Sequence, residues 1–101
     1  MIRWSWVQAC GVVEQLDDEP SLEGLQELVG GYIAYVPETW LTEGVYALIV
    51  NEEAHMYDLA ENAIANECLD VALSPILGDV VVCWDDITSA GLEESLYNSG
   101  A

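Results

Sequence analysis

The stretch from Leu22 to Val36, LEGLQELVGGYIAYV, constrains the fold most, because its hydrophobic period changes halfway along. The first half places apolar residues at the spacing of one helix face, and the second half is typical of a β-strand. Ser21 precedes the helix and is its expected N-cap. Gly30 and Gly31 lie between the two halves. Glycine can end a helix in the left-handed conformation, and it allows the backbone of the following strand to approach closely. We therefore expect a helix, a glycine stop and a strand.

The other elements follow from hydrophobic patterns on either side of this stretch. Residues rich in valine, isoleucine and tryptophan predict strands at 4–16, with a bulge or hairpin near Gly11, at 45–50 and at 80–84. The nearly continuous apolar run at 45–50 favours the middle of a sheet. Residues 58–69 have apolar side chains at helical spacing behind Asp58, their expected cap.

These elements predict an α+β fold for the whole chain. Its 101 residues are expected to form a single domain spanning 1–101. We expect a mainly antiparallel sheet of about four strands, with two main helices on one face of it. Residues 91–97 predict a further short C-terminal helix, which packs Leu92 and Leu96.

Charge is the most unusual property of the composition. The chain has 19 acidic residues and a single basic one, Arg3, which gives a formal net charge of −18. Binding to duplex DNA or RNA draws its affinity from lysine and arginine, and one arginine cannot supply it. Anionic membranes are disfavoured for the same reason. The charge instead favours a basic protein surface as partner, or an adaptation to high salt.

The acidic residues predicted to meet such a partner are spread over the turns and helix faces. They are Asp17, Asp18, Glu19, Glu23, Glu27, Glu52, Glu53, Asp85, Asp86, Glu93 and Glu94. In the sharpest form of this hypothesis the acids imitate the phosphates of DNA and occupy the groove of a nucleic-acid-binding or defence protein. Salt adaptation without a partner is the competing interpretation.

Four segments carry a resemblance to a known family. LQELVGGYI at 25–33, LIVNEE at 48–53, the step Asn62-Ala63 and ILGDVVV at 76–82 together resemble small proteins of bacteriophages, plasmids and their bacterial hosts, known only as a domain of unknown function. The resemblance covers roughly 12–84. The chain departs from the family pattern at 54–61, where a basic or glycine-rich turn and a proline are common. The resemblance implies an accessory protein of a mobile element acting on a host protein, and it implies no reaction.

No residue pattern in the chain predicts catalysis. Asn51, Glu52, Glu53 and His55 have ligand-type side chains, but their spacing does not suit a rigid metal site. The three cysteines are widely spaced and have no CxxC or histidine partner, so zinc is not expected. No nucleophile elbow, phosphate-binding loop or dinucleotide fingerprint is present. We therefore predict a protein that is not an enzyme and uses no cofactor or metal.

A small-molecule site is the alternative from another functional class. Asn51, Asn62 and Trp40 are its candidate contacts, in a pocket between the sheet and the second helix that would sequester a nucleotide-like signal. The acidic composition argues against a phosphate ligand.

The compartment and the assembly state are predicted from the N-terminal segment and the apolar content. The first residues, MIRWSW, lack the apolar core of a signal peptide, and no apolar run approaches membrane-spanning length. Unpaired cysteines fit reduced thiols. These features predict a location in the host cytoplasm. Four tryptophans and a high apolar fraction leave open a homodimer formed through an N-terminal edge strand.

Overall fold

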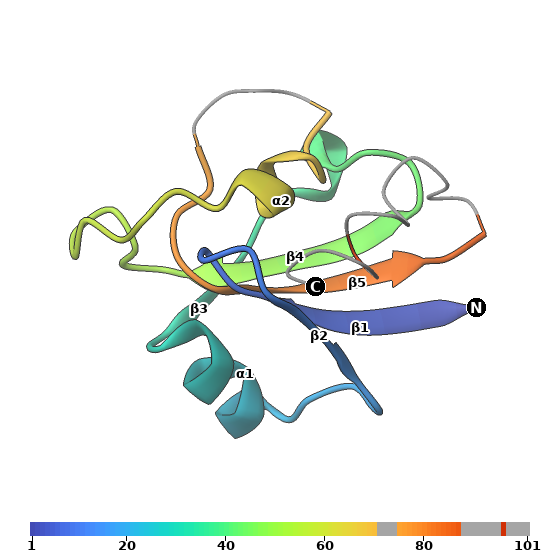
Figure 1. Cartoon of the computed structure of the whole chain (residues 1–101), viewed down its shortest axis with the longest axis horizontal. Helices are drawn as coiled ribbons and strands as arrows, with labels where there is room; N and C mark the ends of the chain where they lie inside the picture. Colours follow the sequence, from blue (N-terminus) through green and yellow to red (C-terminus); the bar gives the residue numbers. More distant parts are fainter. Residues whose placement is uncertain (71–74, 88–95, 97–101) are drawn as a thin grey trace.

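The computed structural model describes residues 1–70, 75–87 and 96. It contains a five-stranded sheet in the order β2-β1-β5-β4-β3, in which every neighbouring pair is antiparallel (Figure 1). The strands are β1 (Ile2–Val7), β2 (Val13–Leu16), β3 (Ile33–Tyr35), β4 (Val45–Asn51) and β5 (Val80–Asp85). The helices are α1 (Leu22–Val29), the 3-10 turn η1 (Glu38–Trp40) and α2 (Ala63–Asn66). The α+β class is therefore confirmed.

The predicted helix, glycine stop and strand form as expected. Ser21 caps α1 by accepting a hydrogen bond from the backbone N–H of Gly24 at 3.1 Å. Gly30 ends the helix at φ 81°, in the left-handed region that glycine enters without a Cβ penalty. β3 then starts at Ile33 and pairs with the end of β4.

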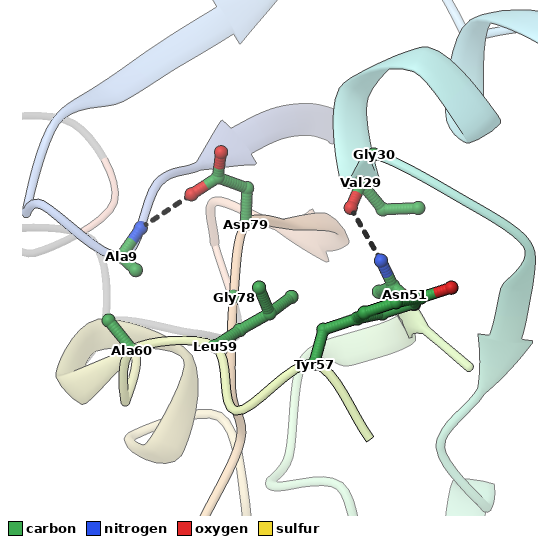
Figure 2. A pocket seen from close by; sticks show the side chains of 9 residues that line it. All are labelled: Ala9, Val29, Gly30, Asn51, Tyr57, Leu59, Ala60, Gly78 and Asp79. Atoms are coloured by element: carbon green, nitrogen blue, oxygen red, sulfur yellow. Dashed lines mark hydrogen bonds between the residues drawn. The ribbon is translucent and has the colours of Figure 1, made fainter. Parts of the chain in front are cut away.

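The predicted strand over 4–16 is a hairpin of two strands. β1 and β2 are joined through Gly11, whose φ of 97° requires glycine, and Val7 faces Val13 across the pair. The Asp79 carboxylate, just before β5, accepts a hydrogen bond from the Ala9 N–H at 2.9 Å and ties this hairpin turn to the central strand (Figure 2). The sheet thus has five strands, because one predicted strand folds back on itself.

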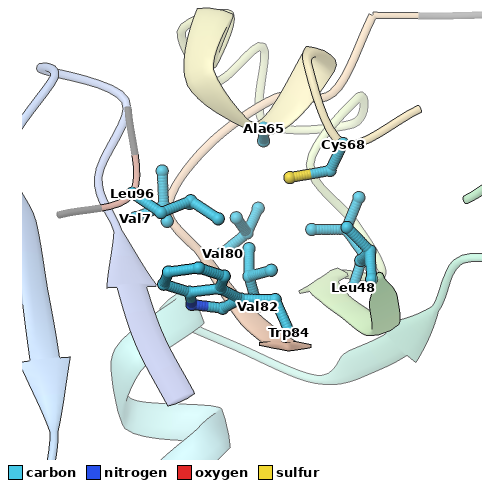
Figure 3. Close-up of a cluster of buried hydrophobic side chains, with 9 residues drawn as sticks. Val7, Leu48, Ala65, Cys68, Val80, Val82, Trp84 and Leu96 are labelled. Atoms are coloured by element: carbon cyan, nitrogen blue, oxygen red, sulfur yellow. The ribbon is translucent and has the colours of Figure 1, made fainter. Parts of the chain in front are cut away.

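The predicted placement of both helices on one face is wrong. α1 and α2 lie on opposite faces of the sheet (Figure 1). Leu25 and Val29 of α1 pack on Ile49 and Val81. On the other face Ala65 of α2 belongs to a second cluster around Trp84 (Figure 3). Successive side chains of a strand point to opposite faces, so the uninterrupted apolar run of β5 fills both layers.

The second helix is shorter than the predicted range 58–69 and begins later. Its cap is Asn62, whereas Asp58 lies in the preceding turn at a positive φ of 50°. Glu61 forms a β-bridge with Leu77, and the Asn62 N–H donates to the Ile76 carbonyl at 2.8 Å. This pairing keeps the chain extended up to Asn62, which delays the start of the helix. The C-terminal helix predicted at 91–97 lies outside the described residues except for Leu96, which is fully buried in the cluster around Trp84.

Candidate functional site

A hollow of about 600 Å³ opens at the end of the sheet, where α1 stops beside the turn that follows β4 (Figure 2). The turn before β5 and the start of the β1–β2 connection form its other walls. Its lining residues are Ala9, Val29, Gly30, Asn51, Tyr57, Leu59, Ala60, Gly78 and Asp79. Its volume lies in the range typical of small-ligand sites, about 300–1,000 Å³.

Asn51 joins α1 to the turn after β4 and so fixes one wall of the hollow. Its side-chain Nδ2 donates to the Val29 carbonyl at 3.1 Å, and its Oδ1 accepts from the Glu53 N–H at 2.8 Å. A Cβ at Gly31 would stand 3.1 Å from the same Nδ2, a tight contact that would require the Asn51 amide to shift by a few tenths of an ångström. Asn51 is buried, and both polar atoms of its side-chain amide form hydrogen bonds within the protein.

Asn62 holds the opposite wall together. Its Nδ2 donates to the carbonyls of Val7 at 3.0 Å and Gly78 at 2.9 Å, while its Oδ1 accepts from the Ala65 N–H at 3.0 Å. The amide is 1% exposed. A Cβ at Gly78 would come within 2.8 Å of the Leu59 side chain, and the residue has a positive φ of 80°. Asn62 therefore has a structural role and does not line the hollow.

The three candidate pocket residues from the sequence do not form one site. Asn51 lines the hollow, and Asn62 supports it from behind. Trp40 lies in η1, where it is half-buried and its carbonyl accepts from the Asp70 N–H at 2.8 Å. Trp40 is absent from the lining of the hollow.

A second, smaller hollow of about 370 Å³ adjoins the first. It is lined by Gln26, Gly30, Gly31, Tyr32, Glu53 and Tyr57, so Gly30 and Tyr57 border both spaces. The Tyr57 and Tyr32 side chains are exposed, at 62% and 65%. The sequence interpretation missed both tyrosines and Asp79. A sequence signal exists for Tyr32 and Asp79, because they lie in the resemblance segments 25–33 and 76–82, which line the hollows together with 48–53. No such signal exists for Tyr57, which lies in 54–61, where the chain departs from the family pattern.

The acidic residues of the sequence prediction fall into three groups. Asp17, Asp18 and Glu19 lie between β2 and α1, and Glu23 and Glu27 lie on α1; all five are exposed. In the turn after β4, Glu52 is exposed and Glu53 is half-buried at the smaller hollow.

The acids at the end of β5 have internal partners. Asp86 accepts from Arg3 Nε at 3.0 Å and from the N-terminal ammonium at 2.9 Å. The ammonium also lies 3.5 Å from Asp85, and these carboxylates raise its pKa. Glu93 and Glu94 lie outside the described residues. The single arginine is therefore paired with Asp86 beside the end of β5.

Within 1–70, 75–87 and 96 no group of three or more histidine, cysteine, aspartate or glutamate side chains is arranged to hold a metal ion. Over the same ranges, no helix combines the length and the apolar character that crossing a bilayer requires. His55 lies exposed in the turn after β4.

The cysteines are expected to differ sharply in reactivity. Burial, with a smaller contribution from Glu67, raises the pKa of the Cys68 thiol to about 12, and burial also raises the pKa of Cys83. Thiolate is the reactive form, so at pH 8 only roughly one part in 10⁴ of Cys68 is reactive. We expect iodoacetamide to alkylate exposed Cys10 alone in the native protein and all three thiols in urea, as measured by mass spectrometry. Cys10→Ser should remove the native adduct, and rapid native labelling of Cys68 would contradict its placement.

Comparison with known proteins gives a family but no activity. A sequence profile described as "Domain of unknown function (DUF3846)" matches residues 8–98. No curated protein and no solved structure matches the chain.

Proposed function

The chain belongs to the DUF3846 family of domains of unknown function, and from that premise we propose that it is a non-enzymatic protein that binds a basic surface of another protein. One observation carries the proposal. The acids of β2, the following turn and α1 are all exposed and have no basic residue between them in the sequence, and we call them the acidic face: Glu14, Asp17, Asp18, Glu19, Glu23 and Glu27.

The arrangement of charge favours a partner over simple solvation. Glu23 and Glu27 are one helical turn apart and repel each other. The last turn of α1 contains no basic residue that would offset them or the negative end of the helix dipole. Arg3 and the N-terminal ammonium are already engaged with Asp86. A basic partner would relieve this repulsion, accelerate association and make the binding sensitive to salt.

In its sharper form the proposal makes the protein a DNA mimic from a phage or another mobile element. The partner would then be a host nucleic-acid-binding or defence protein whose DNA groove the acidic face occupies. The proposal draws on the run of exposed acids from β2 through α1 and on the pairing of Arg3 with Asp86. Competition with duplex DNA distinguishes mimicry from attachment to some other basic surface.

The test compares two triple variants of equal net charge. One neutralises the acidic face through Asp18→Asn, Glu23→Gln and Glu27→Gln, and the other neutralises exposed acids elsewhere: Glu38→Gln, Asp58→Asn and Asp70→Asn. Proteins captured from a bacterial lysate are identified, purified and titrated with each variant at several salt concentrations. We expect the acidic-face variant to bind about tenfold more weakly than the control, since each exposed charge pair contributes about 0.5 kcal/mol.

Binding of a captured nucleic-acid-binding protein should also fall with salt and be displaced by duplex DNA. Equal weakening by both triple variants, or binding that does not respond to salt, would refute the proposal. Adaptation to salt alone predicts no specific capture, and a protein that unfolds at low salt and recovers in molar salt.

Ligand sequestration remains a second proposal because of the hollow beside Asn51. Its volume suits a small molecule. Asp79 and Glu53 in the walls of the two hollows oppose a phosphate group, which argues against a nucleotide-like signal. A thermal-shift screen with neutral, anionic and cationic compounds tests this class directly.

A further inference from the structure

The two hollows that share Tyr57 combine tyrosine rings with carboxylates, whereas the acidic face offers carboxylates alone. We propose that these hollows receive an arginine side chain of the basic partner. The inference rests on the proposed function and names a specific contact within it. The hollows lie at the C-terminal end of α1, next to the acidic face and separate from the acids chosen above.

The aromatic walls are held in place and left open to solvent. The Tyr57 N–H donates to the Glu53 carbonyl at 3.1 Å, and the Leu59 N–H donates to the Ala54 carbonyl at 3.1 Å. Ala54 is buried at 4% exposure, which anchors the turn that presents the Tyr57 ring. An ordered turn that keeps a tyrosine 62% exposed beside a cavity provides a preformed stacking surface.

The electrostatics of the site favour a cation. Asp79 lines the larger hollow and Glu53 the smaller one. The end of α1 at Gly30 borders both and contributes the negative pole of the helix dipole. Among the described residues that line either hollow there is no lysine, arginine or histidine. A phosphate or carboxylate ligand would be repelled, whereas an organic cation would be attracted.

Arginine fits these walls better than lysine does. A guanidinium group is planar and stacks on aromatic rings, and it is less strongly hydrated than an ammonium group. Its donors also form two parallel hydrogen bonds with a carboxylate such as that of Glu53. Tyr57 and Tyr32 supply rings, and the two adjoining volumes leave room for the side chain and its flanking backbone.

The experiment titrates the ¹⁵N-labelled full chain with N-acetyl-arginine-amide, followed by NMR. We expect shifts concentrated at the amides of Gly30, Gly31, Glu53 and Tyr57, with millimolar affinity. The neutral isostere N-acetyl-citrulline-amide and the lysine analogue should both bind more weakly. Shifts spread evenly along the acidic face, or equal binding of the arginine and citrulline compounds, would overturn the proposal. Equal binding of the lysine compound would overturn the choice of arginine.

Matched variants separate the hollows from general charge and exposure. Tyr57→Ala should weaken binding of the arginine compound about two- to fivefold, the usual size of an exposed cation–π contact. Glu53→Gln should weaken it as well. The controls, Tyr35→Ala and Glu52→Gln, alter a similarly exposed tyrosine and the adjacent glutamate, and neither residue lines the hollows. Equal effects in control and test variants would exclude a specific site.

Failure of this inference is distinguishable from failure of the proposed function. None of the residues changed in the two triple charge variants lines either hollow. Loss of partner binding in the acidic-face variant without any arginine-induced shift would retain the basic partner and remove the arginine contact.

Discussion

Replacing Trp84 with alanine is expected to lower the free energy of unfolding by about 4 kcal/mol, the largest single effect we predict for this protein. Trp84 is fully buried in the central strand and packs in a cluster with Val7, Leu48 and Leu96 (Figure 3). Its indole Nε1 donates to the Ser5 hydroxyl at 2.9 Å, also in a fully buried setting. Alanine would leave a cavity and remove that donor. Urea denaturation followed by circular dichroism measures the loss.

Two further variants keep this prediction testable if Trp84→Ala does not fold. Trp84→Phe retains most of the packing and loses the N–H donor, so we expect a loss of about 1–2 kcal/mol. Trp40→Ala removes a half-buried ring in η1 and should cost less than Trp84→Ala. A Trp40 variant as unstable as the Trp84 variant would show that the buried cluster is not the main source of stability.

Asn62→Ala is expected to lower the free energy of unfolding by about 3 kcal/mol, since it removes a helix cap and leaves buried backbone groups without hydrogen-bond partners. The carbonyls of Val7 and Gly78 and the N–H of Ala65 would each lose their side-chain partner. Denaturation in urea again provides the measurement. The same result would separate a structural asparagine from a ligand contact, because a residue reserved for ligand would leave the stability of the unliganded protein unchanged.

Asn62→Ser serves as the matched control. Serine caps helices well but cannot donate to both the Val7 and Gly78 carbonyls. We expect it to recover part of the lost stability, on the order of 1 kcal/mol. A loss below 1 kcal/mol for Asn62→Ala would contradict the hydrogen-bond network described here.

Local signals in the sequence were sufficient for several elements. The Ser21 cap, the left-handed Gly30 and the interior position of β4 follow from residue type and spacing, and the structure confirms each of them. The central strand β5 likewise follows from its apolar run. In these segments local preference and tertiary packing favour the same conformation.

Errors arose where long-range pairing determined the outcome. The start of α2 depends on the bridge between Glu61 and Leu77, which no local pattern in 58–69 encodes. The opposite placement of the helices was indicated by β5, whose consecutive buried residues require cover on both faces. The sequence prediction used a continuous apolar run only at 45–50, to place that strand in the middle of the sheet, and drew nothing from the run at 80–84 about the helices.

The candidate site was only partly predictable. Asn51 was identified and does line the hollow, whereas Asn62 and Trp40 do not. Tyr57 and Asp79 reach the same hollow from segments that are distant in sequence, and only the sheet order places them together. The sheet order also determines which acidic residues are exposed and which are paired. Composition alone cannot distinguish Asp86, which is paired with Arg3, from Glu27, which is exposed on α1.

The central strand also determines when this protein can complete its fold during synthesis. β5 lies between β1 and β4, and Ile2 at one end of the sequence pairs with Asp85 near the other. Until residues 80–85 leave the ribosome, the β1–β2 hairpin and the β3–β4 pair have no strand to join them. Such distant pairing slows folding. The nascent chain must therefore carry Trp4, Trp6 and the apolar face of α1 uncovered in the meantime, and chaperones that recognise exposed apolar segments would encounter it at that stage.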